Sequence, residues 1–569
     1  MRLRPLNDWS CFSKRSCHLL LGLVTSCAVA PHAVAADSAA PLSRPKLIVF
    51  IAIDGLPQRQ VLSYRDQLAP DGFNRFLKRG SWFANAYYGY AFTVTAAGHA
   101  TMLTGAYPHR TGIIGNEWRG NQTGQSEYCT GDTSATYIGH TTRPLDGTSP
   151  KNLKVQTLGD VLRRANPQSK VIAVSGKDRG AILPAGKTGT AYIYMSSTGQ
   201  FASSTYYMQK HPAWVDAFNA GRPADRYFKM EWKALLPEAA YAQSLPDNQP
   251  WFGPAGGGLP ARYSGPDDQT PGPNYYGSLM RGPFGDALTL DFARSAIDGE
   301  QLGHDDAPDI LSISLSGHDY VNHAYSAESR LSHDHLLQLD RLLQAFWRDL
   351  DAKVGKDRYV AVLTADHGFM PAVEYSARQG LPTGRVDSTQ ILANINQGLE
   401  PRFGPGNWVM GFSGSSLLLD KKLLTQKGRD ADALADAART LLLSQPGFAA
   451  AYTRAELLSG SRVDAPFFVP MQNAWHPDAS GEVQYILKSN WKFGLHSNGT
   501  THGSPYAYDT HVPILMYGPP WIGKGRIDKR VEVVDIASTL AELLGVDPPA
   551  TAEGQRLPFI PVAVAAKNR

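Results

Sequence analysis

The chain has 569 residues, of which 43% are hydrophobic and 19% charged, as in an ordinary globular protein with a substantial core. Its formal net charge is +4, and +3 of this falls within residues 1–35, which hold four basic residues and one acidic residue. The remainder is therefore close to neutral at +1. A chain without a basic field is not expected to bind nucleic acid or an anionic membrane.

The N-terminus has the pattern of an export signal. A basic segment is followed by an apolar run over residues 19–30 and by small residues at 33–35. We therefore expect residues 1–35 to be a signal peptide and the mature protein to be periplasmic or secreted. The apolar run is too short to span a bilayer, so no stable membrane insertion is expected. A lipid anchor at Cys27 is the alternative, because residues 24–27 loosely resemble a lipobox.

Cysteine usage restricts the chemistry of the mature chain. Three of the four cysteines, Cys11, Cys17 and Cys27, lie in the leader, which leaves Cys129 alone. One cysteine cannot form an intramolecular disulfide, and it cannot build a metal site of several thiolates. Any metal must therefore be held by oxygen and nitrogen ligands.

The main chain alternates between apolar strands and amphipathic helices. Residues 46–53 form a nearly continuous apolar run, which is typical of a strand buried on both faces of a parallel sheet. This alternation predicts an α/β fold over residues 46–569, a doubly wound, mostly parallel sheet with helices on both faces. The other predicted strands are 170–174, 309–315 and 358–364, and the predicted helices are 73–78, 157–164, 329–354 and 534–544.

Two stretches depart from this alternation. Residues 181–285 are rich in proline, glycine and aromatic residues, and we interpret them as an inserted cap over the edge of the sheet that carries the site. Residues 460–501 form a second irregular stretch. Neither stretch is of low complexity.

The segment 92–105 predicts a short extended stretch that turns into a helix. Thr95 stands at the turn, where its hydroxyl would face the positive end of the helix dipole and unpaired N–H groups. Ala96, Ala97 and Gly98 are small enough to let other backbone approach closely. Taken alone, the pattern favours an ordinary threonine N-cap over a functional threonine.

Three aspartates follow three predicted strands. Asp54 comes after the first strand, Asp319 after the strand ending at 315, and Asp366 after the strand ending at 364. In an open α/β sheet, ligands bind at the carboxyl ends of the strands. Each aspartate alone is an ordinary start of a loop, but three carboxylates on one edge would repel one another unless cations lay between them.

Histidines accompany these aspartates. His323 lies four residues after Asp319, one helical turn away, and His367 directly follows Asp366. His502 lies in a Thr-His-Gly sequence near the end of the chain. Carboxylates and imidazoles without thiolates favour zinc, in a two-metal site roughly 3.5–4 Å across.

These motifs, in this order and over nearly the whole mature chain, resemble those of the alkaline phosphatase superfamily. The matching features are Asp54, the Thr-Ala-Ala-Gly-His sequence from Thr95, and the Asp-x3-His, Asp-His-Gly and Thr-His-Gly motifs. The resemblance implies two zinc ions and a threonine nucleophile. It implies one zinc held by Asp319, His323 and His502, and the other held by Asp54, Asp366, His367 and Thr95.

Two further stretches resemble the PafA-type bacterial alkaline phosphatases. Asn116 follows a glycine turn, and Lys177 and Arg179 follow a predicted strand, where an extended backbone would point them in the same direction. For a lone pair of cations, a solvated surface is the simpler interpretation. The resemblance implies instead that the three side chains contact the oxygens of a phosphoryl group, and two cations with an amide suit a dianion.

The expected function is that of an exported alkaline phosphatase, which hydrolyses small-molecule phosphate monoesters through a phosphothreonine intermediate. A nucleotide pyrophosphatase/phosphodiesterase is the alternative, because it shares the metal ligands and the threonine. An exported phosphate- or metal-binding protein with a degenerate site is less favoured, since each expected ligand is present. A sulfatase would need a cysteine or serine at the position of Thr95, so this class is disfavoured. A cofactor-independent phosphoglycerate mutase would use a serine as its nucleophile and would not be exported, so it is disfavoured as well. The sequence predicts no particular oligomeric state.

Overall fold

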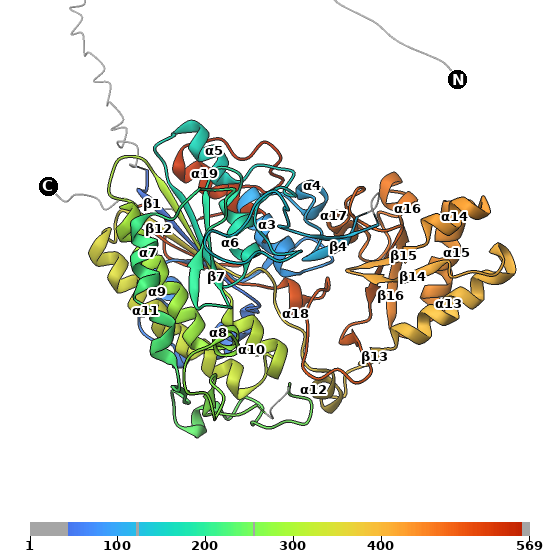
Figure 1. Ribbon diagram of the computed structural model, residues 1–569, viewed down its shortest axis with the longest axis horizontal. Helices are drawn as coiled ribbons and strands as arrows, with labels where there is room; N and C mark the ends of the chain where they lie inside the picture. Colours follow the sequence, from blue (N-terminus) through green and yellow to red (C-terminus); the bar gives the residue numbers. More distant parts are fainter. Residues whose placement is uncertain (1–43, 121–123, 254–256, 560–569) are drawn as a thin grey trace, which may run out of the picture. The chain divides into compact units, whose positions relative to one another are not determined.

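The computed structural model describes residues 44–120, 124–253 and 257–559. The predicted signal peptide and Cys27 lie outside these residues. A nine-stranded sheet forms the centre of the fold (Figure 1). In order across the sheet, its strands are β20 (Gly525–Ile527), β2 (Ser81–Phe83), β19 (Ile514–Tyr517), β12 (Tyr359–Thr364), β1 (Leu47–Ile53), β11 (Asp309–Leu315), β6 (Val171–Ser175), β7 (Thr190–Met195) and β8 (Gln200–Ala202).

The five central strands, from β12 to β7, run parallel. Every residue of β1, β11 and β12 is buried, as expected for strands covered on both faces. Antiparallel pairs occur toward the edges, where β19 lies between β12 and β2 and where β8 pairs with β7. The predicted mostly parallel α/β sheet is confirmed.

Helices cover both faces of the sheet. Figure 1 shows α3, α5, α6 and α19 on one side and α7, α9 and α11 on the other. Among the described helices, none is long and apolar enough to cross a bilayer. Their bounds are α3 (Thr95–Thr104), α5 (Leu158–Ala165), α6 (Asp178–Ala185), α7 (Ala213–Ala220), α9 (Pro283–Glu300), α11 (Arg330–Lys353) and α19 (Asp535–Leu544).

The carboxyl ends of the central strands meet at one edge of the sheet. Ile53 of β1 pairs with Leu315 of β11, and Ser314 pairs with Ser175 of β6. On the other side of β1, Ala52 pairs with Thr364 of β12. The residues that follow these four strands are therefore brought together in the order of the strands, whatever their distance along the chain.

The predicted insertion, residues 181–285, has different bounds in the structure. Its first part contains the end of α6 and both β7 and β8, which belong to the central sheet, and its last residues begin α9. The intervening segment consists of short helices and two-residue strands. Its tryptophans Trp232 and Trp251 are buried against Val321 and Leu331. Aromatic composition alone did not distinguish a sheet edge from the segment packed beside it.

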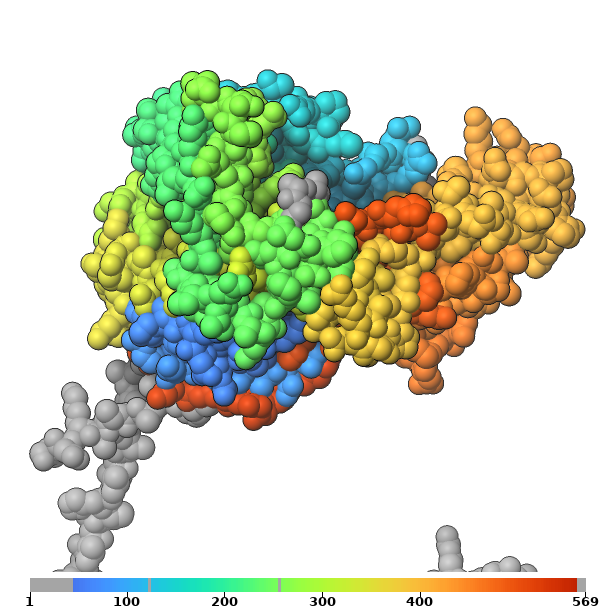
Figure 2. Space-filling view, turned by 90° about the horizontal axis from the view of Figure 1, so that it is seen from below, coloured from blue at the N-terminus to red at the C-terminus, as the bar shows by residue number. Residues whose placement is uncertain are grey.

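A further folded unit, within residues 384–493, was not predicted. An antiparallel sheet of four strands and three helices encloses a hydrophobic core of its own. We call residues 384–453 and 483–493 the accessory lobe; they appear mostly in yellow-orange and orange in Figure 2. The irregular stretch predicted over 460–501 contains two of its strands. The elements of the accessory lobe are α13 (Ser388–Phe403), β14 (Val409–Ser413), β15 (Ser416–Leu419), α14 (Lys421–Lys427), α15 (Ala431–Ser444), β16 (Phe448–Thr453), β17 (Val483–Leu487) and β18 (Trp491–Phe493), which pairs with β13 (Gly384–Val386).

Candidate active site

Helix α3 carries Thr95 into the edge of the sheet. Val94 is extended, with φ −128° and ψ 159°, and Thr95 is the first helical residue, so it stands one position inside the predicted cap. All ten residues of the helix are buried. A Cβ atom on Gly98 would lie 2.3 Å from the carbonyl oxygen of Asp366, which confirms the predicted close approach of another backbone. Thr95 therefore lies one turn from the point where α3 touches the end of β12.

The six aspartates and histidines predicted as ligands gather into two clusters. One contains Asp319, His323 and His502, and the other Asp54, Asp366 and His367. Within each cluster, one ligand atom from every residue lies within 4.8 Å of the others. The clusters also adjoin one another, since His367 Nε2 is 3.5 Å from Asp54 Oδ1 and 4.0 Å from Asp319 Oδ1.

Helix α10 (Gly317–Tyr325) and the loop that carries His502 together place the predicted ligands of the Asp319 cluster. Helix α10 follows β11 and puts His323 Nε2 3.4 Å from Asp319 Oδ1, across one helical turn. Thr500 N donates to the His323 carbonyl at 3.0 Å, which brings the loop of His502 beside α10. His502 Nε2 then lies 3.7 Å from Asp319 Oδ1.

The three imidazoles are oriented by backbone carbonyls. Nδ1 of His323, His367 and His502 lies 2.9 Å from the carbonyl oxygens of Thr500, Gly368 and Thr93, respectively. A ring that donates its Nδ1–H to a carbonyl keeps Nε2 free as an acceptor or a ligand. Burial lowers the pKa of His502 well below its ordinary value, which favours the neutral form that binds metals. All three Nε2 atoms are thus available, and each lies within 4.0 Å of Asp319 Oδ1.

Buried atoms of the clusters have no hydrogen-bond partner within the described residues. They include Asp54 Oδ1, Asp319 Oδ1, Asp366 Oδ2 and His367 Nε2. Unpaired buried carboxylate oxygens are costly, and a bound cation is the usual solution. Oxygen and nitrogen donors in groups of three match the ligand types of zinc. The residues present therefore fit two metal ions.

The charges within the site are unevenly balanced. Burial and the neighbouring Asp366 carboxylate raise the pKa of Asp54 well above its ordinary value. Burial would also raise the pKa of Asp319, but Lys177 and the three imidazoles hold it well below the ordinary value. Three buried carboxylates share one lysine, so further positive charge would stabilise them all.

Lys177 lies between the two clusters. Its Nζ is 2.7 Å from Asp54 Oδ2 and 2.5 Å from Asp319 Oδ2. Burial would lower the pKa of Lys177, but these two carboxylates raise it above the ordinary value, so the ammonium stays charged. Its position follows from the sheet order, because β6, which precedes Lys177, is the neighbour of β11.

The backbone around Arg179 differs from the extended segment that was predicted. Lys177 is the N-cap of α6, and Arg179 is already helical, so alternation along a strand does not orient the pair. Arg179 Nη1 donates instead to the hydroxyl of Tyr128 at 3.0 Å, and this hydroxyl donates to Asp178 Oδ1 at 2.7 Å. The Arg179 side chain is 18% exposed.

Asn116 is attached to the same helix as Thr95. Its Oδ1 accepts a hydrogen bond from the Ala96 N–H at 2.9 Å. With Oδ1 engaged at the start of α3, the Nδ2 group is left as a donor for an anionic oxygen. An amide donor is thereby anchored one residue from the Thr95 backbone.

Comparison with known proteins gives matches to a family, to curated relatives and to solved structures. The family described as type I phosphodiesterase/nucleotide pyrophosphatase matches residues 48–505. The alkaline phosphatase PafA of Elizabethkingia meningoseptica is 34% identical over 90% of this chain and 94% of its own. A protein of Myroides odoratus named calcium-transporting ATPase is 34% identical over 89% and 93%. The crystal structure of wild-type alkaline phosphatase PafA superposes with a TM-score of 0.83 at 33% identity, over 91% of this chain and 99% of that one.

The chain belongs to this phosphodiesterase family of the alkaline phosphatase superfamily.

Two site residues of this family member were not singled out from the sequence. His99 lies one turn after Thr95 and is fully buried. Its Nδ1 is 2.9 Å from the Thr95 carbonyl oxygen and 3.3 Å from Asp366 Oδ2, and its Nε2 is 2.9 Å from Ser314 Oγ. It thus connects the helix of Thr95 to the second cluster. The spacing of four residues from Thr95 was a signal available in the sequence.

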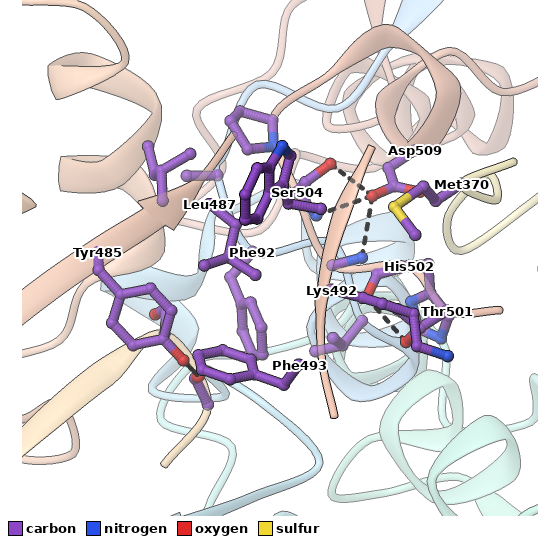
Figure 3. A pocket seen from close by; sticks show the side chains of 18 of the residues that line it. Phe92, Met370, Tyr485, Leu487, Lys492, Phe493, Thr501, His502, Ser504 and Asp509 are labelled. Atoms are coloured by element: carbon purple, nitrogen blue, oxygen red, sulfur yellow. Dashed lines mark hydrogen bonds between the residues drawn. The ribbon is translucent and has the colours of Figure 1, made fainter. Parts of the chain in front are cut away.

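Asp509 holds the loop that carries His502. Its Oδ2 accepts hydrogen bonds from the N–H groups of Gly503 and Ser504, at 3.0 and 2.9 Å, and from the Ser504 hydroxyl (Figure 3). Burial raises the pKa of Asp509 to about 7. No local motif distinguishes this aspartate from the many at the starts of helices.

Proposed function

We propose that this chain is an exported alkaline phosphatase, which hydrolyses phosphate monoesters at a site for two zinc ions through a phosphothreonine intermediate. The observation that carries the proposal is the position of Lys177, whose ammonium contacts Asp54 of one cluster and Asp319 of the other. The Lys177 ammonium is a fixed positive charge between the two groups of ligands. It lies at the carboxyl ends of the strands, where helix α3 begins at Thr95. That arrangement suits the transfer of a doubly charged phosphoryl group.

Thr95 acts as the nucleophile in this proposal. Its oxygen forms a bond to phosphorus while the bond to the leaving alcohol breaks, and the alcohol departs on the side opposite Thr95. Water then attacks the phosphothreonine, which releases inorganic phosphate and restores the hydroxyl. Two zinc ions, when bound, would lower the pKa of the hydroxyl and stabilise the leaving oxygen.

The chain's own groups bind the phosphoryl oxygens. Asn116 offers its Nδ2 donor, since its Oδ1 is engaged with Ala96, and Lys177 and Arg179 supply positive charge. Both cations are held in place before substrate binds, Lys177 by two carboxylates and Arg179 by the Tyr128 hydroxyl. Groups that are already oriented need little reorganisation as charge develops in the transition state.

Phosphodiester hydrolysis is the alternative within the same family. A diester has one negative charge fewer, and its second substituent would compete with the cations for space. Four relatives named alkaline phosphatase are 31–34% identical to this chain over 89–90% of its length, which supports monoester hydrolysis, while the relative of Myroides odoratus carries another name. The buried cation between the clusters favours monoesters.

Metal removal tests the proposed site. Chelation should abolish turnover of an aryl phosphate, and zinc should restore it better than magnesium, because imidazoles and carboxylates favour zinc. Metal analysis of the restored enzyme should give two zinc ions per chain. Full activity with fewer than two zinc ions per chain, or better restoration by magnesium, would contradict the two-zinc site.

A further inference from the structure

A cavity of about 540 Å³ opens beside the cluster of Asp319. His323 and His502 line it on one side. Phe92, Tyr485 and Phe493 line it as well, and Figure 3 shows their rings grouped together at the side of the cavity away from His502. Its size lies within the range of about 300–1,000 Å³ of small-molecule sites.

Direct contacts hold the rings of Phe92, Tyr485 and Phe493, which we call the aromatic wall, in place. The Tyr485 hydroxyl donates to the Gly414 carbonyl at 2.7 Å, and the rings of Tyr485 and Phe493 pack edge to face with centroids 5.8 Å apart. A Cβ atom on Gly414 would lie 3.4 Å from the ring of Phe92, and one on Gly503 would lie 3.3 Å from it. Phe92 therefore lies between the accessory lobe and the loop of His502.

Two charged residues that line the cavity, Lys492 and Asp509, are already engaged with the protein. Lys492 Nζ donates to the carbonyls of Gly499 and Ser497 at 2.9 and 3.2 Å. Asp509 Oδ2 accepts three hydrogen bonds from Gly503 and Ser504. What the wall offers a ligand is therefore mainly aromatic faces and edges, which bind planar rings in offset or edge-to-face arrangements.

The direction of the reaction places the leaving group in this cavity. In an in-line displacement, the leaving oxygen lies opposite the attacking Thr95. The resemblance places the Thr95 oxygen with the cluster that contains Asp54. The leaving oxygen on the opposite side therefore falls to the other cluster, that of Asp319, His323 and His502. Two of these three residues line the cavity, so the group attached to the leaving oxygen extends into it.

We propose that this cavity is a leaving-group subsite that selects phosphate monoesters of planar aromatic alcohols. The inference rests on the proposed phosphatase function, because it takes the leaving oxygen from that mechanism. The accessory lobe, which supplies Tyr485 and Phe493, would then choose the substrate while the central sheet performs the chemistry.

The test compares benzyl phosphate, cyclohexylmethyl phosphate and methyl phosphate with the zinc-loaded enzyme. Benzyl and cyclohexylmethyl phosphate are both esters of primary alcohols with rings of similar size, so their main difference is aromaticity. We expect a higher kcat/KM for benzyl phosphate. The substitution Phe493→Ala should lower the benzyl-to-methyl ratio of kcat/KM roughly tenfold, as expected for the loss of one aromatic contact.

Tyr206→Ala serves as the matched control. Tyr206 is an aromatic residue that is 40% exposed and lies outside the cavity. This control should leave the ratio unchanged. An equal loss for all three esters in Phe493→Ala, or no preference of the unmodified enzyme for benzyl over cyclohexylmethyl phosphate, would overturn the proposal.

A binding measurement separates failure of the subsite from failure of the proposed function. Calorimetry with benzylphosphonate and methylphosphonate needs no turnover. We expect benzylphosphonate to bind more tightly, and Phe493→Ala to remove this difference. If no ester is hydrolysed, the phosphatase function is wrong, while the phosphonates still report on the cavity. Equal affinity for the two phosphonates would overturn the subsite.

Discussion

Replacing Thr95 by alanine should lower kcat/KM for an aryl phosphate by roughly 10⁴–10⁶-fold, the loss expected when a nucleophile is removed. The hydroxyl forms the bond to phosphorus, and no neighbouring side chain on α3 carries another hydroxyl at that position. The six aspartate and histidine ligands remain, so metal content should change little. Steady-state kinetics and metal analysis of the same preparation measure both quantities.

Two further variants make the Thr95 result specific. Thr95→Ser keeps a hydroxyl and should retain part of the activity. Thr101→Ala removes a buried threonine from the same helix, two turns further on, and should cost only a few-fold. Turnover close to that of the unmodified enzyme in metal-replete Thr95→Ala would rule out a threonine nucleophile.

The double substitution Lys177→Ala with Arg179→Ala should lower monoester kcat/KM by very roughly 10²–10⁴-fold. Each charge-assisted contact is worth about 1.5–3 kcal/mol, and about 1.4 kcal/mol corresponds to a factor of ten. Hydrolysis of the matching methyl diester should fall much less, because its substituted oxygen cannot use both cations. The monoester-to-diester ratio should therefore narrow, as measured by paired kinetics on the two substrates.

Loss of metal is the competing explanation for that result, since Lys177 contacts Asp54 and Asp319. Zinc content is therefore measured alongside the kinetics. Lys187→Ala, which removes an exposed lysine just beyond α6, is the matched control and should leave both rates unchanged. Equal losses for monoester and diester at full zinc content would mean that the cations support the site without selecting the substrate.

Much of the central fold could be predicted because its signals are local. The fully buried strand β1 is apolar at every position, and the helix predicted at 329–354 matches α11 to within one residue at each end. Three aspartates after three such strands could be placed on one edge because parallel strands end together. The order of the strands, which puts Lys177 beside Asp319, is a property of pairing that local patterns do not contain.

The accessory lobe could not be predicted for the same reason. Its strands are short, and β15 pairs with a strand more than sixty residues later, with Ser416 opposite Gln484. The aromatic wall could not be predicted either, because it combines Phe92 with Tyr485 and Phe493, which lie far from Phe92 along the chain and belong to the accessory lobe. Arg179 was placed on extended backbone, but the chain turns into α6 directly after Lys177. The boundary of a short strand before a helix depends on packing as well as on sequence.

The most direct test of monoester hydrolysis is the kcat/KM of the zinc-loaded enzyme for 4-nitrophenyl phosphate and for methyl 4-nitrophenyl phosphate. The two substrates share a leaving group, so the comparison isolates the charge and substitution of the phosphoryl group. We predict a clear preference for the monoester, because Lys177 and Arg179 place two cations at a site for a dianion. A preference for the diester would contradict the phosphatase assignment and support the diesterase alternative.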